Sequence, residues 1–192
     1  MMKEIVIASG NKGKIRETQE ILNEYNIVSL RDVGLDIDVE EDGKTFEENA
    51  IKKAETIAKE LDRKMCIADD SGIEIEYLNG FPGVRTKRWH NGTDRERNLA
   101  IIEKLKGVQK EKRKIKFVTA IAVSDGNNTI CEKGIIEGYV TERPRGDNGF
   151  GFDEIFELDN GKTLAEISDE EKNKISARKI ALERIRKKLE EI

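Results

Sequence analysis

The chain has 192 residues, 39% of them charged, and a formal net charge of −4. This length suits one α/β domain and is short for two independent ones. Acidic and basic residues are interspersed, which is typical of a folded chain rather than a disordered one. The acidic balance argues against a nucleic-acid-binding protein, which normally carries a basic excess.

Membrane and secretion signals are also missing from the sequence. No apolar stretch reaches the ~20 residues that a membrane span needs. Lys3 and Glu4 interrupt the amino terminus before any long apolar run. Cys66 and Cys131 form no CxxC pattern and are predicted to be ordinary core residues of a reduced protein. We therefore expect a cytoplasmic protein with neither a membrane nor a nucleic-acid partner.

The scarcity of histidine restricts the chemistry. His90 is the only histidine and lies in a polar stretch typical of a loop, so the usual kind of zinc site cannot be assembled. A catalytic metal would have to be held by carboxylates, which favours Mg²⁺, with Mn²⁺ as the alternative. Hydrolysis would then use a carboxylate or a metal-polarised water in place of a histidine base.

The first predicted elements are a strand and a helix joined by a glycine-rich turn. Residues 3–8 predict a buried strand, and helical spacing follows at Ile15, Thr18, Leu22 and Tyr25. Between them, residues 9–14 read SGNKGK. Such a turn can aim free backbone N–H groups at an anion, or it can be an ordinary βα turn. It is not a Walker A loop, because Ile15 stands where Ser or Thr would coordinate magnesium.

A long helix is predicted from Thr45 to about residue 63, with Thr45 and Glu48 as a capping box. Its buried stripe comprises Phe46, Ala50, Ala54, Ile57 and Leu61. Lys53 falls on the edge of this stripe, so it either snorkels to water or points into a cleft. The acidic cluster at residues 40–43 precedes the helix, where interaction with the helix dipole is a sufficient explanation.

Two adjacent carboxylates follow the next predicted strand. Residues 65–68 are apolar and end in Asp69 and Asp70. Ligands of open α/β sheets bind at the carboxyl ends of strands, so this pair indicates a functional site. A tight turn rich in Asp and Gly is the alternative. An alternating strand with Ile73, Ile75 and Tyr77 on one face comes next, and a turn at residues 79–83 follows it.

The second half of the chain predicts a helix, a hairpin and a glycine-rich loop. Residues 94–106 are predicted to be helical, and residues 117–124 and 129–140 predict a β-hairpin joined at 125–128. The basic run at residues 110–116 is predicted to be a solvated loop. Glycines and aromatics concentrate at residues 145–153, where Phe150 or Phe152 either stacks on a base or fills the core.

The carboxyl-terminal segment is predicted to be helical. Ser168 and Glu171 form a capping box, and Ser176 is a candidate for a second N-cap. The apolar stripe consists of Ile175, Leu182, Ile185 and Leu189. Arg178 lies within this stripe, and a buried arginine without a partner is costly. We therefore expect Arg178 to face a carboxylate or a ligand.

Taken in order, these segments resemble the inosine-triphosphate (non-canonical purine NTP) pyrophosphatases from end to end. The matching motifs are ASGNKGK (8–14), TFEENA (45–50) with Lys53 and Ala54, ADDSG (68–72), FPG (81–83), RPRG (143–146), GFGFD (149–153), AE (165–166), EK (171–172) and IS (175–176). The resemblance implies one α/β domain over residues 1–192, with two lobes around an elongated mixed β-sheet and a nucleotide cleft between them. It also implies a homodimer.

The resemblance further implies a magnesium-dependent hydrolase. Its substrates would be (deoxy)nucleoside triphosphates such as ITP, dITP and XTP, cleaved to the monophosphate and pyrophosphate to clear damaged nucleotides from the pool. The transition state spreads negative charge over several phosphate oxygens, which lysines, a helix amino terminus and magnesium stabilise.

Roles for individual residues follow from the matching motifs. Those expected to hold the triphosphate are Ser9, Gly10, Asn11, Lys12, Gly13, Lys14 and Lys53, with Lys14 and Lys53 also catalytic. Glu41 and Asp70 would hold Mg²⁺, Asp70 would be the base for the attacking water, and Asp69 would position that centre. The residues expected around the base and sugar are Ser71, Phe150, Gly151, Phe152, Asp153, Lys172 and Arg178.

One departure from the family pattern bears on specificity. Ala177 stands where the family usually has a histidine that reads the purine's six-position oxygen. An altered base preference is therefore one alternative, because a pocket that lacks a hydrogen-bond partner discriminates less. A non-catalytic nucleotide sensor is the other alternative. The presence of both Glu41 and Asp70 favours the enzyme, because binding alone would not require both carboxylates.

Overall fold

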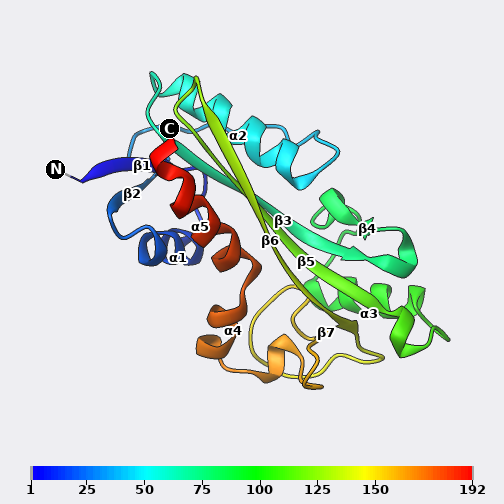
Figure 1. Cartoon of the computed structure of the whole chain (residues 1–192). Helices are drawn as coiled ribbons and strands as arrows, with labels where there is room; N and C mark the ends of the chain where they lie inside the picture. Colours follow the sequence, from blue (N-terminus) through cyan, green and yellow to red (C-terminus); the bar gives the residue numbers. More distant parts are fainter. Residues whose placement is uncertain (1, 192) are drawn as a thin grey trace. The chain divides into compact units, whose positions relative to one another are not determined.

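A 7-stranded mixed β-sheet runs through the chain, of which the computed structural model describes residues 2–191 (Figure 1). The strands are β1 (Lys3–Ile7), β2 (Tyr25–Ser29), β3 (Cys66–Ile75), β4 (Phe81–Pro82), β5 (Lys114–Ser124), β6 (Thr129–Val140) and β7 (Phe156–Glu157). Their order is β2-β1-β3-β5-β6-β7, and β4 pairs with β3. The β1–β2 and β1–β3 pairs are parallel, whereas β3–β4 and β6–β7 are antiparallel.

Helices connect and flank the strands, which confirms the α/β class. They are α1 (Lys12–Ile21), α2 (Phe46–Glu60), α3 (Asp94–Lys104), α4 (Asp169–Ile175) and α5 (Ala177–Lys188). Short 3-10 turns lie at Glu76–Leu78, Gly83–Arg85, Lys110–Lys112, Leu164–Glu166 and Leu189–Glu191. Over residues 2–191, none of these helices combines the length and the apolar character that crossing a membrane requires.

The chain divides into two compact units, each built from segments distant in sequence. Unit 1 contains the residues up to Ser71, Thr119–Gly134 and the residues from Ala177 onward. Unit 2 contains Gly72–Val118 and Ile135–Ser176. The nucleotide cleft expected between two lobes stays a prediction.

The core of unit 1 joins β1 to the carboxyl-terminal helix. Ile5 and Ile7 of β1 pack in one cluster with Leu182 and Ile185 of α5, all of them buried. Helix α1 lies beside α5 (Figure 1) and contributes the neighbouring Leu22. Removing such side chains from water is the main stabilising term of the fold. This core fixes α1 and α5 against the sheet edge at which β1 ends.

Unit 2 has its own apolar core. Ile73 and Ile75 from β3, Ile101 from α3 and Phe156 from β7 are fully buried together. Phe152 is 8% exposed and belongs to the same cluster. Of the two roles considered for Phe150 and Phe152, Phe152 therefore takes the core role.

The predicted boundaries in unit 1 need two corrections. Tyr25 lies in β2, a strand that the sequence did not predict, and not on the helix that contains Thr18. Helix α2 ends at Glu60 rather than near residue 63, because Asp62 and Arg63 adopt left-handed backbone with φ of 52° and 65°. Its predicted buried residues Phe46, Ala50, Ala54 and Ile57 are confirmed.

The strand that carries the two aspartates is longer than predicted. β3 continues through Asp69 and Asp70 to Ile75, so these carboxylates lie within a strand and not in a turn. Tyr77 lies beyond the strand, in a 3-10 turn, and is 52% exposed instead of sharing a buried face with Ile75.

Further corrections concern the basic run and the carboxyl terminus. Arg113 is only 3% exposed, so residues 110–116 are not a uniformly solvated loop. The hairpin is confirmed, with β5 beginning earlier, at Lys114. The Ser168–Glu171 capping box is also confirmed. Ser176 has extended backbone and separates α4 from α5, so Ile175 does not continue the stripe of α5.

Candidate active site

Parallel pairing of β1 and β3 brings the glycine-rich turn close to the aspartates. Ile7 pairs with Ile67, and the Ala8 N–H donates to the Ile67 carbonyl at 2.8 Å. Ser9 therefore lies at the level of Asp69, two residues further along each strand. The carboxyl end of β1 and the middle of β3 form the base of the site in unit 1.

The turn is partly closed by its own asparagine. The Asn11 side chain caps α1 and accepts from the backbone N–H groups of Gly13 at 2.8 Å and Lys14 at 3.2 Å. The Ser9 hydroxyl accepts from the Asn11 N–H at 3.2 Å. Within residues 2–191, the backbone N–H groups of Gly10 and Lys12 have no hydrogen-bond partner. These two groups, and not the whole helix amino terminus, are available to an anion.

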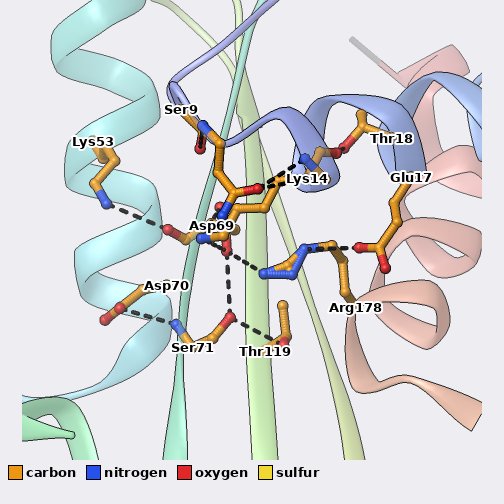
Figure 2. Close-up of polar contacts among 12 residues, drawn as sticks. Ser9, Lys14, Glu17, Thr18, Lys53, Asp69, Asp70, Ser71, Thr119 and Arg178 are labelled. Carbon is orange, nitrogen blue, oxygen red and sulfur yellow. Dashed lines mark hydrogen bonds and ion pairs between the residues drawn. The ribbon is translucent and has the colours of Figure 1, made fainter. Parts of the chain in front are cut away.

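Asp69 is surrounded by cations (Figure 2). Its carboxylate accepts from Lys14 Nζ at 2.8 Å and from Arg178 Nη2 at 3.0 Å. Burial alone would raise the pKa of Asp69, but Arg178, Lys14 and Lys53 outweigh burial and hold the pKa well below its ordinary value. Asp69 therefore stays ionised. The prediction that Arg178 faces a carboxylate is confirmed.

Asp70 lies in the opposite kind of environment. It is 7% exposed and accepts from Asn49 Nδ2 at 2.9 Å and from the Ser71 N–H at 2.9 Å. Burial raises its pKa, and the negative charge of Glu41 adds to this rise. The bonds from Asn49 and Ser71 and the charge of Lys53 act in the opposite direction without cancelling it. A carboxylate with a raised pKa is a better proton acceptor near neutral pH than an ordinary one.

Lys53 links the acidic segment before α2 to the strand. It forms an ion pair with Glu41, and its Nζ donates to the backbone carbonyl of Asp69 at 3.3 Å. Asn49, one turn earlier on α2, accepts from the Gly43 N–H at 2.7 Å and so anchors the same segment. Of the two explanations considered for Lys53, the structure favours the one in which it points inward.

The donor set of the site suits a hard divalent cation. Glu41 and Asp70 interact electrostatically, and Glu41 also pairs with Lys53. Over the described part of the chain, no group of three His, Cys, Asp or Glu side chains could hold a metal. Mg²⁺ is usually bound by one or two carboxylates plus waters and substrate phosphates. Glu41 and Asp70 fit this pattern, whereas a metal cage made of protein alone does not form.

The remaining predicted residues lie in unit 2. Asp153 accepts from the Phe150 N–H at 2.9 Å and also pairs with Lys172. The Lys172 Nζ lies 4.8 Å from the centroid of the Phe150 ring. Phe150 is 78% exposed, which keeps its ring available for stacking. Phe152 is the exception in this group, because its side chain packs in the core and is not presented to a ligand.

Helix α3 anchors this loop at Gly151. The Gly151 N–H donates to Asp94 at 2.8 Å, and the Gly151 carbonyl accepts from Asn98 Nδ2 at 2.9 Å. The backbone N–H and carbonyl of Gly151 are thus both held by side chains that lie one turn apart on α3. Gly149 has a φ of +82°, and a Cβ there would collide with the Asp153 carboxylate. The loop that presents Phe150 is therefore held by residues of α3 as well as by its own.

Sequence reasoning missed Asn49 and Asn98 as site residues. Both are 1% exposed, although asparagine usually lies at the surface. Asn49 is three residues after Phe46 and four before Lys53, so helical spacing alone placed it on the face that turns inward. Thr119, whose hydroxyl accepts from the Ser71 hydroxyl at 3.0 Å, gave no comparable signal.

Comparisons with known proteins agree over nearly the whole chain. Residues 5–188 match the model of the Ham1 family. A dITP/XTP pyrophosphatase of Bacillus subtilis is 47% identical over 196 residues, covering 99% of this chain and 98% of the relative. A dITP/XTP pyrophosphatase of Clostridium perfringens is 44% identical over 202 residues, covering 100% and 99%.

Solved structures give the same result. The Ham1 protein of Staphylococcus aureus has a TM-score of 0.91 at 40% identity, covering 98% of this chain and 99% of that protein. A HAM1 protein of Coxiella burnetii also has a TM-score of 0.91, at 39% identity over 100% of both chains. With this sequence identity, coverage and fold, the chain belongs to the Ham1 family.

Proposed function

We propose that this protein hydrolyses non-canonical purine nucleoside triphosphates, such as dITP, ITP and XTP, to the monophosphate and pyrophosphate. The observation that carries the proposal is the arrangement around β3, where the buried Asp70 is held by Asn49 and the Ser71 N–H, and the cations Lys14, Lys53 and Arg178 contact the neighbouring Asp69. The relatives named dITP/XTP pyrophosphatases, which match over nearly their whole length, support the same activity. An altered base preference and a non-catalytic sensor are not favoured by these relatives.

The cations of unit 1 would receive the triphosphate. Lys14, Lys53 and Arg178 are balanced at present by Asp69 and Glu41, and they already converge on the turn after β1. The free N–H groups of Gly10 and Lys12 would add directional donors to phosphate oxygens. Fixed donors of this kind stabilise the negative charge that develops on the phosphates in the transition state.

Asp70 would act as the general base. It would accept a proton from the water that attacks the phosphorus, while the bond to the pyrophosphate leaving group breaks. Asn49 and the Ser71 N–H hold the carboxylate in one orientation for this transfer. Asp69 stays ionised and positions Lys14 and Arg178. The two neighbouring aspartates thus have separate duties, which their different pKa values set.

Glu41 and Asp70 are the residues that would hold Mg²⁺, or Mn²⁺ as the alternative. When bound, the ion would supply Lewis-acid stabilisation of phosphate oxygens. Lys53 pairs with Glu41, which keeps the lysine next to one of the carboxylates that would hold the ion. The base would stack on the exposed ring of Phe150. Ala177 is buried and offers the base no polar group.

The test is pyrophosphate release from ITP, XTP, dITP and the four standard ribonucleotides, with Mg²⁺ and with EDTA. We expect release that requires the metal and prefers the deaminated purines. Asp70→Asn should lower kcat by about 10²–10⁴-fold, the usual contribution of a general base. Glu41→Gln should raise the Mg²⁺ concentration needed for half activity. Asp42→Asn is the matched control, since Asp42 is adjacent but pairs with Lys52 at the surface.

Two outcomes would contradict the proposal. Nucleotide binding without hydrolysis of any substrate would support the sensor, and equal hydrolysis of all bases would support the altered specificity.

We also propose, from the resemblance, that the protein is a cytoplasmic homodimer. Its two cysteines are free, and burial raises the pKa of the Cys66 thiol to about 12, which suits a reducing compartment. Light scattering of the purified protein tests the dimer.

A further inference from the structure

Unit 2 contains a charged cavity that is lined by none of the residues assigned above to the nucleotide or the metal. It has a volume of about 350 Å³ and opens to solvent. Its charged lining consists of Lys110, Arg113, Glu142, Arg143, Arg145 and Glu157. Cavities of small-molecule sites begin at about 300 Å³, so this one suits a small ligand. None of these residues takes part in the activity proposed above, although Arg143 and Arg145 belong to the RPRG motif.

Arg113 is the fixed part of this lining. It is 3% exposed, and its guanidinium donates to three backbone carbonyls: Val140 at 2.8 Å, Leu105 at 3.0 Å and Thr141 at 2.5 Å. Arginine has five N–H donors, so two remain after these bonds. Within residues 2–191 no carboxylate forms an ion pair with Arg113. Burial lowers its pKa, and Glu142 acts in the opposite direction. The protein therefore holds a rigid, buried positive charge without neutralising it.

The other charges of the cavity are unevenly matched. Glu157 forms ion pairs with two cations, Lys110 and Arg145, the latter through Nη2 at 2.7 Å. Arg143 is exposed and forms no ion pair with any described residue. The buried Thr141 hydroxyl has no hydrogen-bond partner in the described chain, and the buried Arg145 Nε has only the Glu166 carboxylate, at an ion-pair distance of 3.7 Å. Buried polar groups without partners are rare, because each costs the free energy of its lost hydration.

From this arrangement we propose that the cavity is a binding site for a small phosphate-bearing anion, separate from the catalytic residues of unit 1. Four cationic and two acidic side chains line the cavity, and Glu166 adds a third acid through its ion pair with Arg145, so the positive charge stays in excess and an anion is favoured. The fork of a fixed guanidinium matches phosphate oxygens. Arg113 supplies the preformed donor, and Arg143 closes on the ligand from the solvent side. This inference does not depend on the proposed activity.

Residue-resolved NMR tests the site directly. We would titrate ¹⁵N-labelled protein with inorganic phosphate and with pyrophosphate, without divalent metal, at an ionic strength of about 0.1 M to screen weak attraction. Saturable shifts of the backbone amides of residues 110–113, 140–143 and 145 are expected. Shifts at residues 9–14 report the separate phosphate contacts of unit 1, so the two sites are distinguished within one experiment. Saturation by phosphate or by pyrophosphate alone identifies which of the two anions the cavity takes.

Arg143→Gln is the decisive variant, because an exposed arginine without a partner can be replaced without unfolding the protein. Binding at the cavity should weaken by about tenfold or more, the factor that one charge-assisted hydrogen bond supplies. Lys106→Gln is the matched control, since Lys106 also belongs to unit 2 but pairs with Glu103 at the surface. Arg113→Gln removes three anchoring bonds and can unfold the protein, so it does not carry the test.

Three results would overturn the proposal. Shifts that never saturate would mean only diffuse attraction to a basic surface. Equal weakening by Arg143→Gln and Lys106→Gln would mean that the cavity does not select the anion. An equal response to acetate at the same ionic strength would exclude the phosphate assignment.

Discussion

Asp69 and Asp70 are adjacent in β3 but lie in opposite electrostatic environments. Asp69 contacts Lys14 at 2.8 Å and Arg178 at 3.0 Å, and its pKa is held low. Among the residues that the structure describes, no cation forms an ion pair with Asp70, and burial together with the charge of Glu41 raises its pKa. Successive side chains of a strand point to opposite faces, which is how neighbours in sequence meet different partners. The two residues should therefore respond differently to acid and to mutation.

Asp69→Asn is expected to destabilise the protein by about 1–3 kcal/mol at neutral pH, because it weakens the charge-assisted bonds from Lys14 and Arg178, although Arg178 keeps its ion pair with Glu17. The folded pKa of Asp69 lies below its ordinary value of 3.8. Its stabilising contribution is therefore present above about pH 5 and is lost as the pH falls through 3.8 toward the folded pKa. Urea unfolding from pH 7 to pH 3 measures both effects.

In that series the wild type should lose stability with acid more steeply than Asp69→Asn. Other carboxylates also titrate in this range, so the difference between the two proteins is the quantity to compare. Parallel curves would show that the contacts with Lys14 and Arg178 do not stabilise the ionised form.

Asn49→Leu tests how the protein orients the proposed base. The change removes the bond to Asp70 and the anchor of Gly43, so the pKa of Asp70 should rise and Glu41 should be held less firmly. We expect the acid limb of the kcat/KM profile to move to higher pH, together with a weaker response to Mg²⁺. Stability should fall by about 1–3 kcal/mol, the cost of leaving buried partners unsatisfied.

Asn98→Leu is the control for Asn49→Leu, and it also makes a separate prediction. Asn98 is equally buried, but it anchors Gly151 in the Phe150 loop and has no contact with Asp70. We expect KM for the nucleotide to rise by about tenfold or less with kcat nearly unchanged, since loss of loop order reduces binding rather than chemistry. A shift in the acid limb for Asn98→Leu, or none for Asn49→Leu, would contradict the separate roles.

The sequence predicted those elements whose signal is local. Residues 3–8 and the hairpin predicted at 117–124 and 129–140 are apolar runs with clear turns, and α2 begins at the Thr45 cap. The length of β3 was missed because Asp69 and Asp70 look like turn residues. Their partners lie 55, 109 and 21 positions away, at Lys14, Arg178 and Asn49. A local sequence pattern does not show that distant residues satisfy the two buried carboxylates. The aspartates were therefore predicted to follow the strand, although they lie inside it.

The same limit explains why the burial of Arg113 was not predicted from the sequence. Within a basic run, each residue has the pattern of a solvated surface. Its three acceptors are backbone carbonyls at Val140, Leu105 and Thr141, which carry no sequence signature. The family resemblance supplied the residues of the candidate site, whereas the charged cavity of unit 2 required the structure.

Phe150→Ala should separate binding from stability. The ring is 78% exposed, so its loss should change the free energy of unfolding by no more than about 0.5 kcal/mol. If the base stacks on this ring, KM should rise by roughly 5- to 150-fold, since base–aromatic stacking is worth about 1–3 kcal/mol.

Phe152→Ala is the matched comparison, two residues away and 8% exposed. It should cost about 3–5 kcal/mol of stability, because it opens a cavity in the core of unit 2. Chemical denaturation measures the free energy of unfolding of both variants, and steady-state kinetics measures their KM for the nucleotide. An unchanged KM in a folded Phe150→Ala protein would remove Phe150 from the nucleotide site.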